Sequence, residues 1–181
     1  MRETGPGGLE HKFMAFEEAP RIDADCVIEG YASLFGVADR GGDIVARGAY
    51  RAGLERLSAE GRSVKMLWQH DPARPVGVWD LVEEVERGLR VRGRLLQEVR
   101  DGREAAALIG AGAIDGLSIG YRTVRAEKSG SGRILHEIDL WEVSLVTFPM
   151  LPAARLDLGG GDDPLSRSLA DAFAEARARL D

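Results

Sequence analysis

The stretch that decides the fold is Gly116-Leu117-Ser118-Ile119-Gly120-Tyr121-Arg122-Thr123-Val124. Its first five residues match the G-x-S-x-G signature of nucleophilic serines, which normally lies on a strand-to-helix elbow. The residues after Gly120 are instead typical of a continuing strand. We expect the two glycines to let another backbone, such as that of a substrate, approach the hydroxyl of Ser118 closely. The stretch therefore predicts a candidate nucleophile carried by a strand.

The order of residues along the chain excludes the α/β-hydrolase fold, in which an acid and then a histidine follow the serine. The only histidine after Ser118 is His136, and the only acid between them is Glu127. The regular alternation of strands and helices that this fold requires is also missing from the sequence.

Outside this stretch, short segments with the alternation and composition of strands dominate the chain. We predict helices at Ala49–Leu57 and Gly102–Ala111, and a flexible hairpin connection at Lys128–Gly132. The pattern indicates a mainly β fold with flanking helices (α+β), a closed or nearly closed β-barrel ringed by helices. The predicted strands are Glu10–Phe16, Val27–Ser33, Val64–Trp68, Val76–Val85, Leu89–Leu95, Leu117–Val124, Arg133–Glu137 and Leu140–Val146.

Changes in composition divide the chain into four parts. Residues 1–8 are glycine-rich and predicted to be flexible, and residues 9–157 are expected to form the barrel domain. Residues 158–164 have the Gly/Asp composition of a linker. Residues 165–181 contain an Ala/Arg/Glu-rich amphipathic helix at Leu165–Leu180.

Bulk composition narrows the classes of function. The 181 residues contain 44% hydrophobic and 30% charged residues, as a single globular domain does. A net charge of −6 without a basic stripe disfavours nucleic-acid binding. No apolar stretch approaches the length of a membrane span, and no signal peptide is recognisable. The single cysteine, Cys26, fits a reducing compartment, so we expect a protein of the cytoplasmic type.

A nucleophilic serine needs a base within hydrogen-bond reach and a third group that orients the base. Of the three histidines, His11 and His136 have the surroundings of surface residues. His70 follows the apolar run Met66-Leu67-Trp68, so it stands where a buried strand emerges into a turn. Its alternative interpretation is a turn histidine capped by Asp71.

The candidate third group is Glu142, in Leu140-Trp141-Glu142-Val143-Ser144-Leu145-Val146. Both faces of this segment are mainly apolar, which indicates a central strand, and a carboxylate there needs a partner. That partner is either a histidine or, more commonly, an arginine in a structural ion pair. Ser144 is a rival nucleophile, but it lacks flanking glycines. A serine in such a position more commonly makes a local hydrogen bond.

We expect neither a metal nor a cofactor. His136-Glu137 has no second histidine one helical turn further on, and Cys26 has no partner for a zinc site. The glycine-rich segments lack the lysine pattern of a P-loop. His70, Ser118 and Glu142 therefore remain as the candidates for catalysis.

Several further segments, taken in order, resemble the prohead maturation proteases of tailed phages. The resemblance extends from roughly Gly30 to Ala154. The segments are Gly30-Tyr31-Ala32-Ser33-Leu34-Phe35-Gly36, Asp39 with Gly42-Asp43-Ile44-Val45, Gly48-Ala49-Tyr50, Leu67-Trp68-Gln69-His70-Asp71, Pro75-Val76-Gly77, Gly88-Leu89, Gly116–Tyr121 and Leu140–Val146 with Pro149.

This resemblance implies a serine endopeptidase with a fold like that of herpesvirus assembly proteases. By similarity, His70 would be the base, Ser118 the nucleophile and Glu142 the third member, where the herpesvirus relatives have a histidine. The expected partners are the major capsid protein or a scaffold protein, with self-cleavage and self-association. The expected location is the immature capsid in the cytoplasm of a bacterial host carrying a phage, a prophage or a phage-like particle such as a gene transfer agent. The alternative is a non-catalytic capsid-assembly or scaffold-binding module.

Overall fold

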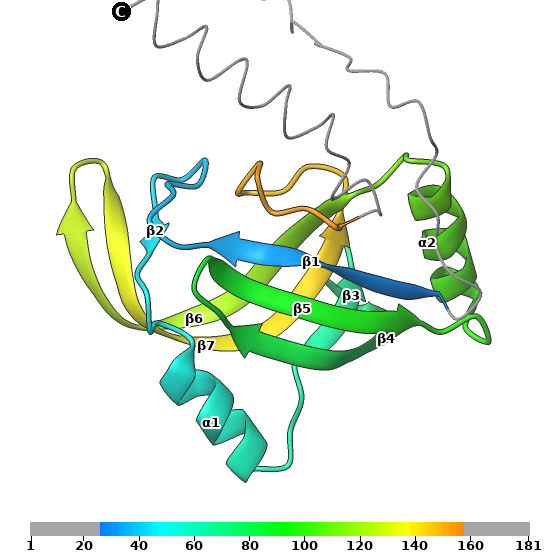
Figure 1. Cartoon of the computed structure of the whole chain (residues 1–181), viewed down its shortest axis with the longest axis horizontal. Helices are drawn as coiled ribbons and strands as arrows, with labels where there is room; N and C mark the ends of the chain where they lie inside the picture. Colours follow the sequence, from blue (N-terminus) through cyan, green and yellow to red (C-terminus); the bar gives the residue numbers. More distant parts are fainter. Residues whose placement is uncertain (1–25, 158–181) are drawn as a thin grey trace, which may run out of the picture.

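The computed structural model describes residues 26–157, which form a curled β-sheet with two helices at its edges (Figure 1). The architecture is mainly β with flanking helices, as the sequence predicted. In chain order the elements are β1 (Val27–Leu34), β2 (Ile44–Val45), α1 (Arg51–Ala59), β3 (Lys65–Trp68), β4 (Asp71–Glu84), β5 (Gly88–Leu95), α2 (Arg100–Gly110), β6 (Gly116–Ser129) and β7 (Gly132–Val146).

Most elements lie where the sequence placed them, and three differ. The strand expected from Val76 begins at Asp71, directly after a two-residue turn. The two segments expected at 133–137 and 140–146 are one continuous strand, β7. The short strand β2 was not predicted, because two residues are too few to show alternation. The strand expected at 10–16 and the helix expected at 165–180 lie outside the described residues.

Strand β7 is the centre of the sheet. The sheet has the order β1-β5-β4-β3-β7-β2, and β6 pairs with β7 along nearly its whole length. β3 runs parallel to β7, with Leu67 opposite Ser144, while β6 is antiparallel, with Ser118 opposite the same Ser144. The end of β3 and the first half of β6 therefore lie on either side of one short segment of β7.

Residues 154–157 connect the two ends of the curled sheet. Arg155 accepts a backbone hydrogen bond from Tyr31 of β1 at 3.1 Å. On the other side, Leu117 of β6 donates to Ala154 at 2.9 Å, and Leu156 donates to Asp115 at 2.8 Å. Although β1 and β6 are not paired with each other, this segment is hydrogen-bonded to both strands.

The core lies inside the curl. Leu117, Val143 and Leu145 are completely buried, so the strands that surround the middle of β7 are fixed by packing as well as by hydrogen bonds. α1 packs against β7, and α2 packs against β4 and β5. The middle of β7 and the adjoining part of β6 therefore form a rigid base for polar side chains. Two of these side chains, Ser118 on β6 and Ser144 on β7, are themselves buried.

Candidate active site

His70 lies in the two-residue turn between β3 and β4, and its backbone is unusual. Gln69 and His70 have φ angles of +51° and +62°, a left-handed conformation that residues other than glycine rarely adopt. The turn is held against β7, because the backbone N–H of Gln69 donates to the carbonyl of Leu145 at 3.0 Å. Strained backbone of this kind persists only where the surroundings over-determine it, and it clusters at functional sites.

The pairing of β6 with β7 places the other two candidates. Ser118 is opposite Ser144, and Gly120 is opposite Glu142. Since alternate residues of a strand share a face, Glu142 and Ser144 point to the same side of the sheet. The histidine, the serine and the carboxylate thus come from three neighbouring segments of the sheet.

The structure brings His70, Ser118 and Glu142 into one chain of hydrogen bonds. Nε2 of His70 lies 2.9 Å from Oγ of Ser118, and Nδ1 lies 2.6 Å from Oε1 of Glu142. A carboxylate can only accept, so Nδ1 carries a proton and donates it to Glu142. Nε2 of the neutral ring is then free to accept the hydroxyl proton of Ser118.

Ser144 completes the arrangement. Its Oγ donates to Oε2 of Glu142 at 2.5 Å and accepts the backbone N–H of His70 at 3.1 Å. Ser144 is fully buried, so both bonds lie away from bulk water. The sequence assigned Ser144 only a local hydrogen bond. Its contact with the turn depends on the parallel pairing of β3 with β7, which no local pattern revealed.

The surroundings of His70 favour its protonated form. The hydrogen bond to Glu142 is the main cause of a pKa raised above the ordinary value of histidine, and the negative charge of Glu142 acts in the same direction. Partial burial opposes this shift. The side chain of Glu142 is only 12% exposed, and that of His70 is 42% exposed. The carboxylate is therefore sheltered, while the imidazole can be reached from solvent.

The glycines around Ser118 have a different role from the one that the sequence suggested. A Cβ atom on Gly120 would lie 2.1 Å from Oε1 of Glu142, so the missing side chain is the space through which the carboxylate reaches His70. At Gly116 the corresponding space is taken by the carbonyl of Val146 and the ring of Pro149. Residues of this chain therefore fill both gaps: the backbone of Val146 approaches Gly116 closely, and the side chain of Glu142 takes the space at Gly120.

The other polar residues that the sequence singled out have separate partners. Asp71 accepts the backbone N–H of Ala73 at 2.9 Å rather than capping His70. His136 lies 3.2 Å from Glu127 on the β6–β7 hairpin, where its side chain is 28% exposed. His11 lies outside the described residues.

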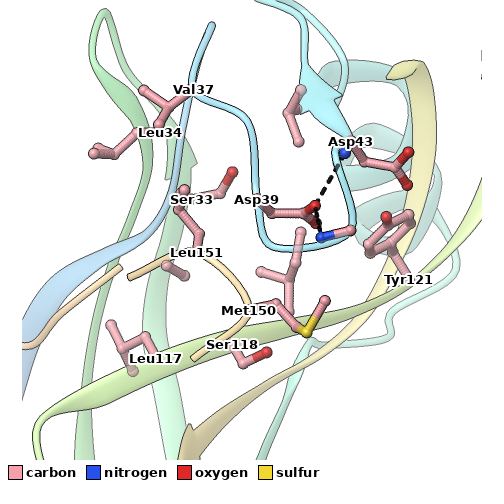
Figure 2. Close-up of a pocket in the computed structure, with 14 residues that line it drawn as sticks. Ser33, Leu34, Val37, Asp39, Asp43, Leu117, Ser118, Tyr121, Met150 and Leu151 are labelled. Carbon is pink, nitrogen blue, oxygen red and sulfur yellow. Dashed lines mark hydrogen bonds between the residues drawn. The ribbon is translucent and has the colours of Figure 1, made fainter. Parts of the chain in front are cut away.

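A cavity of about 190 Å³ opens beside Ser118 (Figure 2). It lies between β6, β1, the loop that precedes β2 and the segment that follows β7. Figure 2 shows Ser118 and Leu117 on one side, with Asp39 and Asp43 across from them and Met150 and Leu151 on the segment after β7. The nucleophile candidate is therefore buried in the sheet and yet borders a cavity.

Within residues 26–157, no three side chains of the histidine, cysteine, aspartate or glutamate type cluster closely enough to hold a metal ion. None of the helices in the same part of the chain is long and apolar enough to cross a membrane.

The chain belongs to the caudovirus prohead serine protease family, since the model of that family matches residues 15–162. This match agrees with the resemblance drawn from the sequence motifs.

The prohead protease of Enterobacteria phage HK97 is 35% identical to the chain over 127 residues. The alignment covers 68% of this chain and 55% of that protease, so the chain spans about half the length of this curated relative.

Among solved structures, the capsid assembly protease of bacteriophage T4 superimposes with a TM-score of 0.56 at 19% identity, covering 68% of this chain and 82% of that one. This likeness shows a shared fold. The KSHV protease gives a TM-score of 0.46 at 12% identity, covering 72% of this chain and 63% of that one. This TM-score is too low to establish a shared fold.

Proposed function

We propose that this chain is a serine endopeptidase in which Ser118 is the nucleophile, His70 the general base and Glu142 the orienting acid. The observation that carries the proposal is the continuous chain of hydrogen bonds from Ser118 through His70 to Glu142, at 2.9 and 2.6 Å. Nucleophile, base and orienter within hydrogen-bond reach are the geometric signature of acyl transfer by serine. Membership of a serine protease family supports the same reaction.

In the first half of the reaction, Oγ of Ser118 attacks the carbonyl carbon of a peptide bond. Its proton moves to Nε2 of His70 as the new C–O bond forms. Nδ1 keeps its proton, which Glu142 accepts in a hydrogen bond, and the carboxylate stabilises the resulting imidazolium. When the tetrahedral intermediate collapses, Nε2 gives its proton to the departing amine, and an acyl ester remains on Ser118.

In the second half, water attacks the ester and His70 again takes and returns the proton. Ser144 acts throughout as a positioning residue. It holds Oε2 of Glu142 and the backbone N–H of His70, so one side chain fixes both the acid and the strained turn that carries the base.

The substrate we propose is a protein of the phage head, either a scaffold or the N-terminal scaffolding region of the major capsid protein. The relatives that support this are named a prohead protease and a capsid assembly protease. The proposal includes self-cleavage, self-association, and action inside the immature capsid in the host cytoplasm. We also infer that the curled sheet is the wall of the nearly closed barrel expected from the sequence, which the hydrogen bonds of residues 154–157 to both sheet ends support.

The test is co-expression with the matching major capsid protein, followed by N-terminal sequencing of the product. The wild-type chain should release a shortened capsid protein, and Ser118→Ala should abolish cleavage while leaving the protein folded. Intact-mass measurement after treatment with a simple fluorophosphonate should show one adduct at Ser118. An unchanged yield of cleaved capsid protein with Ser118→Ala would contradict the proposal and favour a non-catalytic capsid-assembly module.

A further inference from the structure

The cavity beside Ser118 carries a charge that the proposed hydrolysis does not use. Most of its lining is apolar and comes from β1, β6 and the segment after β7. Two carboxylates, Asp39 and Asp43, lie on the loop that precedes β2, across the cavity from Ser118 (Figure 2). The apolar part of the lining includes Leu34, Val37, Ile119, Met150 and Leu151.

The two carboxylates differ in their partners. Asp43 accepts from Nε and Nη2 of Arg133 at 3.1 and 2.5 Å, and this hydrogen bonding lowers the pKa of Asp43. Asp39 accepts only backbone N–H groups through Oδ1, from Gly41 at 2.8 Å and from Asp43 at 3.0 Å. Across residues 26–157, no lysine, arginine or histidine forms an ion pair with Asp39; Arg133 pairs with Asp43, and the charge of Asp39 adds only to the effect of Asp43 in raising the pKa of Arg133.

The field of this carboxylate extends over the cavity. Asp43 and Asp39 both contribute to the raised pKa of Tyr121, which lines the same space, after burial as the largest cause. Arg133 is held by Asp43 and does not line the cavity, so within residues 26–157 no basic side chain contacts the carboxylate of Asp39 directly, although the charge of Asp39 acts on Arg133 at longer range. A carboxylate in mainly apolar, partly buried surroundings is normally paired.

We propose that this cavity binds a basic side chain, lysine or arginine, of the substrate residue that Ser118 acylates. This rests on the proposed protease function. The aliphatic stem of such a side chain would pack on the apolar lining, while its charged end would reach Oδ2 of Asp39. Long basic residues combine an apolar stem with a cationic head. The cavity offers an apolar lining for the stem and, across from Ser118, the carboxylate of Asp39 for the head.

The position of the cavity decides which side of the cleaved bond it serves. Nε2 of His70 must give its proton to the departing amine, so the leaving residue lies on the His70 side of Ser118. His70 and Glu142 are not among the residues that line the cavity, whereas Ser118 is. The cavity is therefore on the side of the residue that stays bonded to Ser118 in the acyl ester.

The experiment compares diphenyl phosphonate probes that share one peptide backbone and differ only in the side chain next to phosphorus. Lysine is compared with norleucine, which has the same stem without the ammonium group, and with glutamate. The rate of modification of Ser118 is followed on the full chain by intact-mass measurement. We expect the lysine probe to react at least about tenfold faster than norleucine, as a charge-assisted hydrogen bond allows, and glutamate to be slowest.

Asp39→Asn is the matching variant, because an asparagine Oδ1 can still accept the two backbone N–H groups of the loop. In this variant the lysine-to-norleucine ratio should fall to about one. Asp80→Asn is the control, since Asp80 is a carboxylate paired with Arg94 and does not line the cavity, and the ratio should remain that of the wild type.

Equal rates for lysine and norleucine with the wild-type chain would overturn the basic-side-chain proposal, even if Asp39→Asn failed to fold. The serine protease function would stand in that case, provided that a fluorophosphonate without any side chain still modified Ser118. Failure of this simple reagent to modify Ser118 would overturn the protease function and the cavity assignment with it.

Discussion

Glu142 and Asp139 are two carboxylates three residues apart on β7, and their side chains are similarly sheltered, 12% and 19% exposed. Asp139 accepts from Arg56 and Arg122, each through an Nη2 at 2.5 Å, and these bonds lower its pKa. Glu142 faces one histidine and one serine. Permanent cations fix Asp139 in a single state, whereas the partner of Glu142 can gain and lose a proton near neutral pH. The comparison separates a structural acid from one that can serve a reaction.

The largest expected effect is the loss of the Glu142 charge. Glu142→Gln should lower kcat/KM for a peptide substrate by about 10³- to 10⁴-fold, since the amide cannot stabilise the imidazolium and favours the wrong tautomer. Asp139→Asn should change the same value by less than about threefold, since the side-chain partners of Asp139 are Arg56 and Arg122 and not the residues of the proposed triad. Comparable losses of kcat/KM in both variants would contradict the assignment of a catalytic role to Glu142 and a structural role to Asp139.

The second-largest effect on activity is expected from a side chain added at Gly120. Gly120→Ala adds a methyl group where Oε1 of Glu142 now lies, so the carboxylate must move away from His70. A misplacement of this size should reduce kcat by about 10²-fold. In a chain that already carries Glu142→Ala, the same change should have little further effect. A full additional loss in the double variant would show that Gly120 acts through something other than Glu142.

Removing the hydroxyl of Ser144 should have a smaller effect. Ser144→Ala leaves Oε2 of Glu142 and the N–H of His70 without their shared partner, so we expect kcat to fall about tenfold with KM nearly unchanged. Ser144→Cys keeps a weak donor and acceptor and should recover part of the loss. A change confined to KM, or to thermal stability alone, would show that Ser144 is only a packing residue.

The smallest effects should appear in the pH dependence. Because Glu142 raises the pKa of His70, neutral imidazole predominates only above an elevated pKa, and kcat/KM should rise with pH through a value above the ordinary one of histidine. Glu142→Gln should move this acid limb to lower pH. An unmoved limb in a correctly folded variant would assign the titration to another group.

Stability should show opposite signatures at the two acids. A raised folded pKa means that the His70–Glu142 pair stabilises the fold fully below about pH 6.5, and that this contribution is lost as the pH rises through the folded pKa. For Asp139, with its pKa lowered, the contribution is present above about pH 4 and is lost as the pH falls through the folded pKa. Thermal unfolding of Asp139→Asn should therefore differ from wild type by a few degrees at neutral pH and converge with it in acid.

Much of the site could be predicted from local sequence, since a serine between glycines and a carboxylate in an apolar strand both stand out against the demands of core packing. The role of Ser144 could not, because its bond to the turn depends on the pairing of β3 with β7. The left-handed backbone of Gln69 and His70 has no local signature either, as neither residue is a glycine. Asp39 is part of a motif, but its position opposite Ser118 follows from how the loop before β2 folds over β6.

The middle position of β7 also determines when the proposed enzyme can first act. His70 is 48 residues from Ser118 and 72 residues from Glu142, and β7, which links them, is the last strand in chain order within residues 26–157. A growing polypeptide that has left the ribosome only as far as β6 holds the serine and the histidine without the strand that aligns them. Because translation runs in one direction, the three side chains of the proposed triad can be aligned only after β7 has been synthesised.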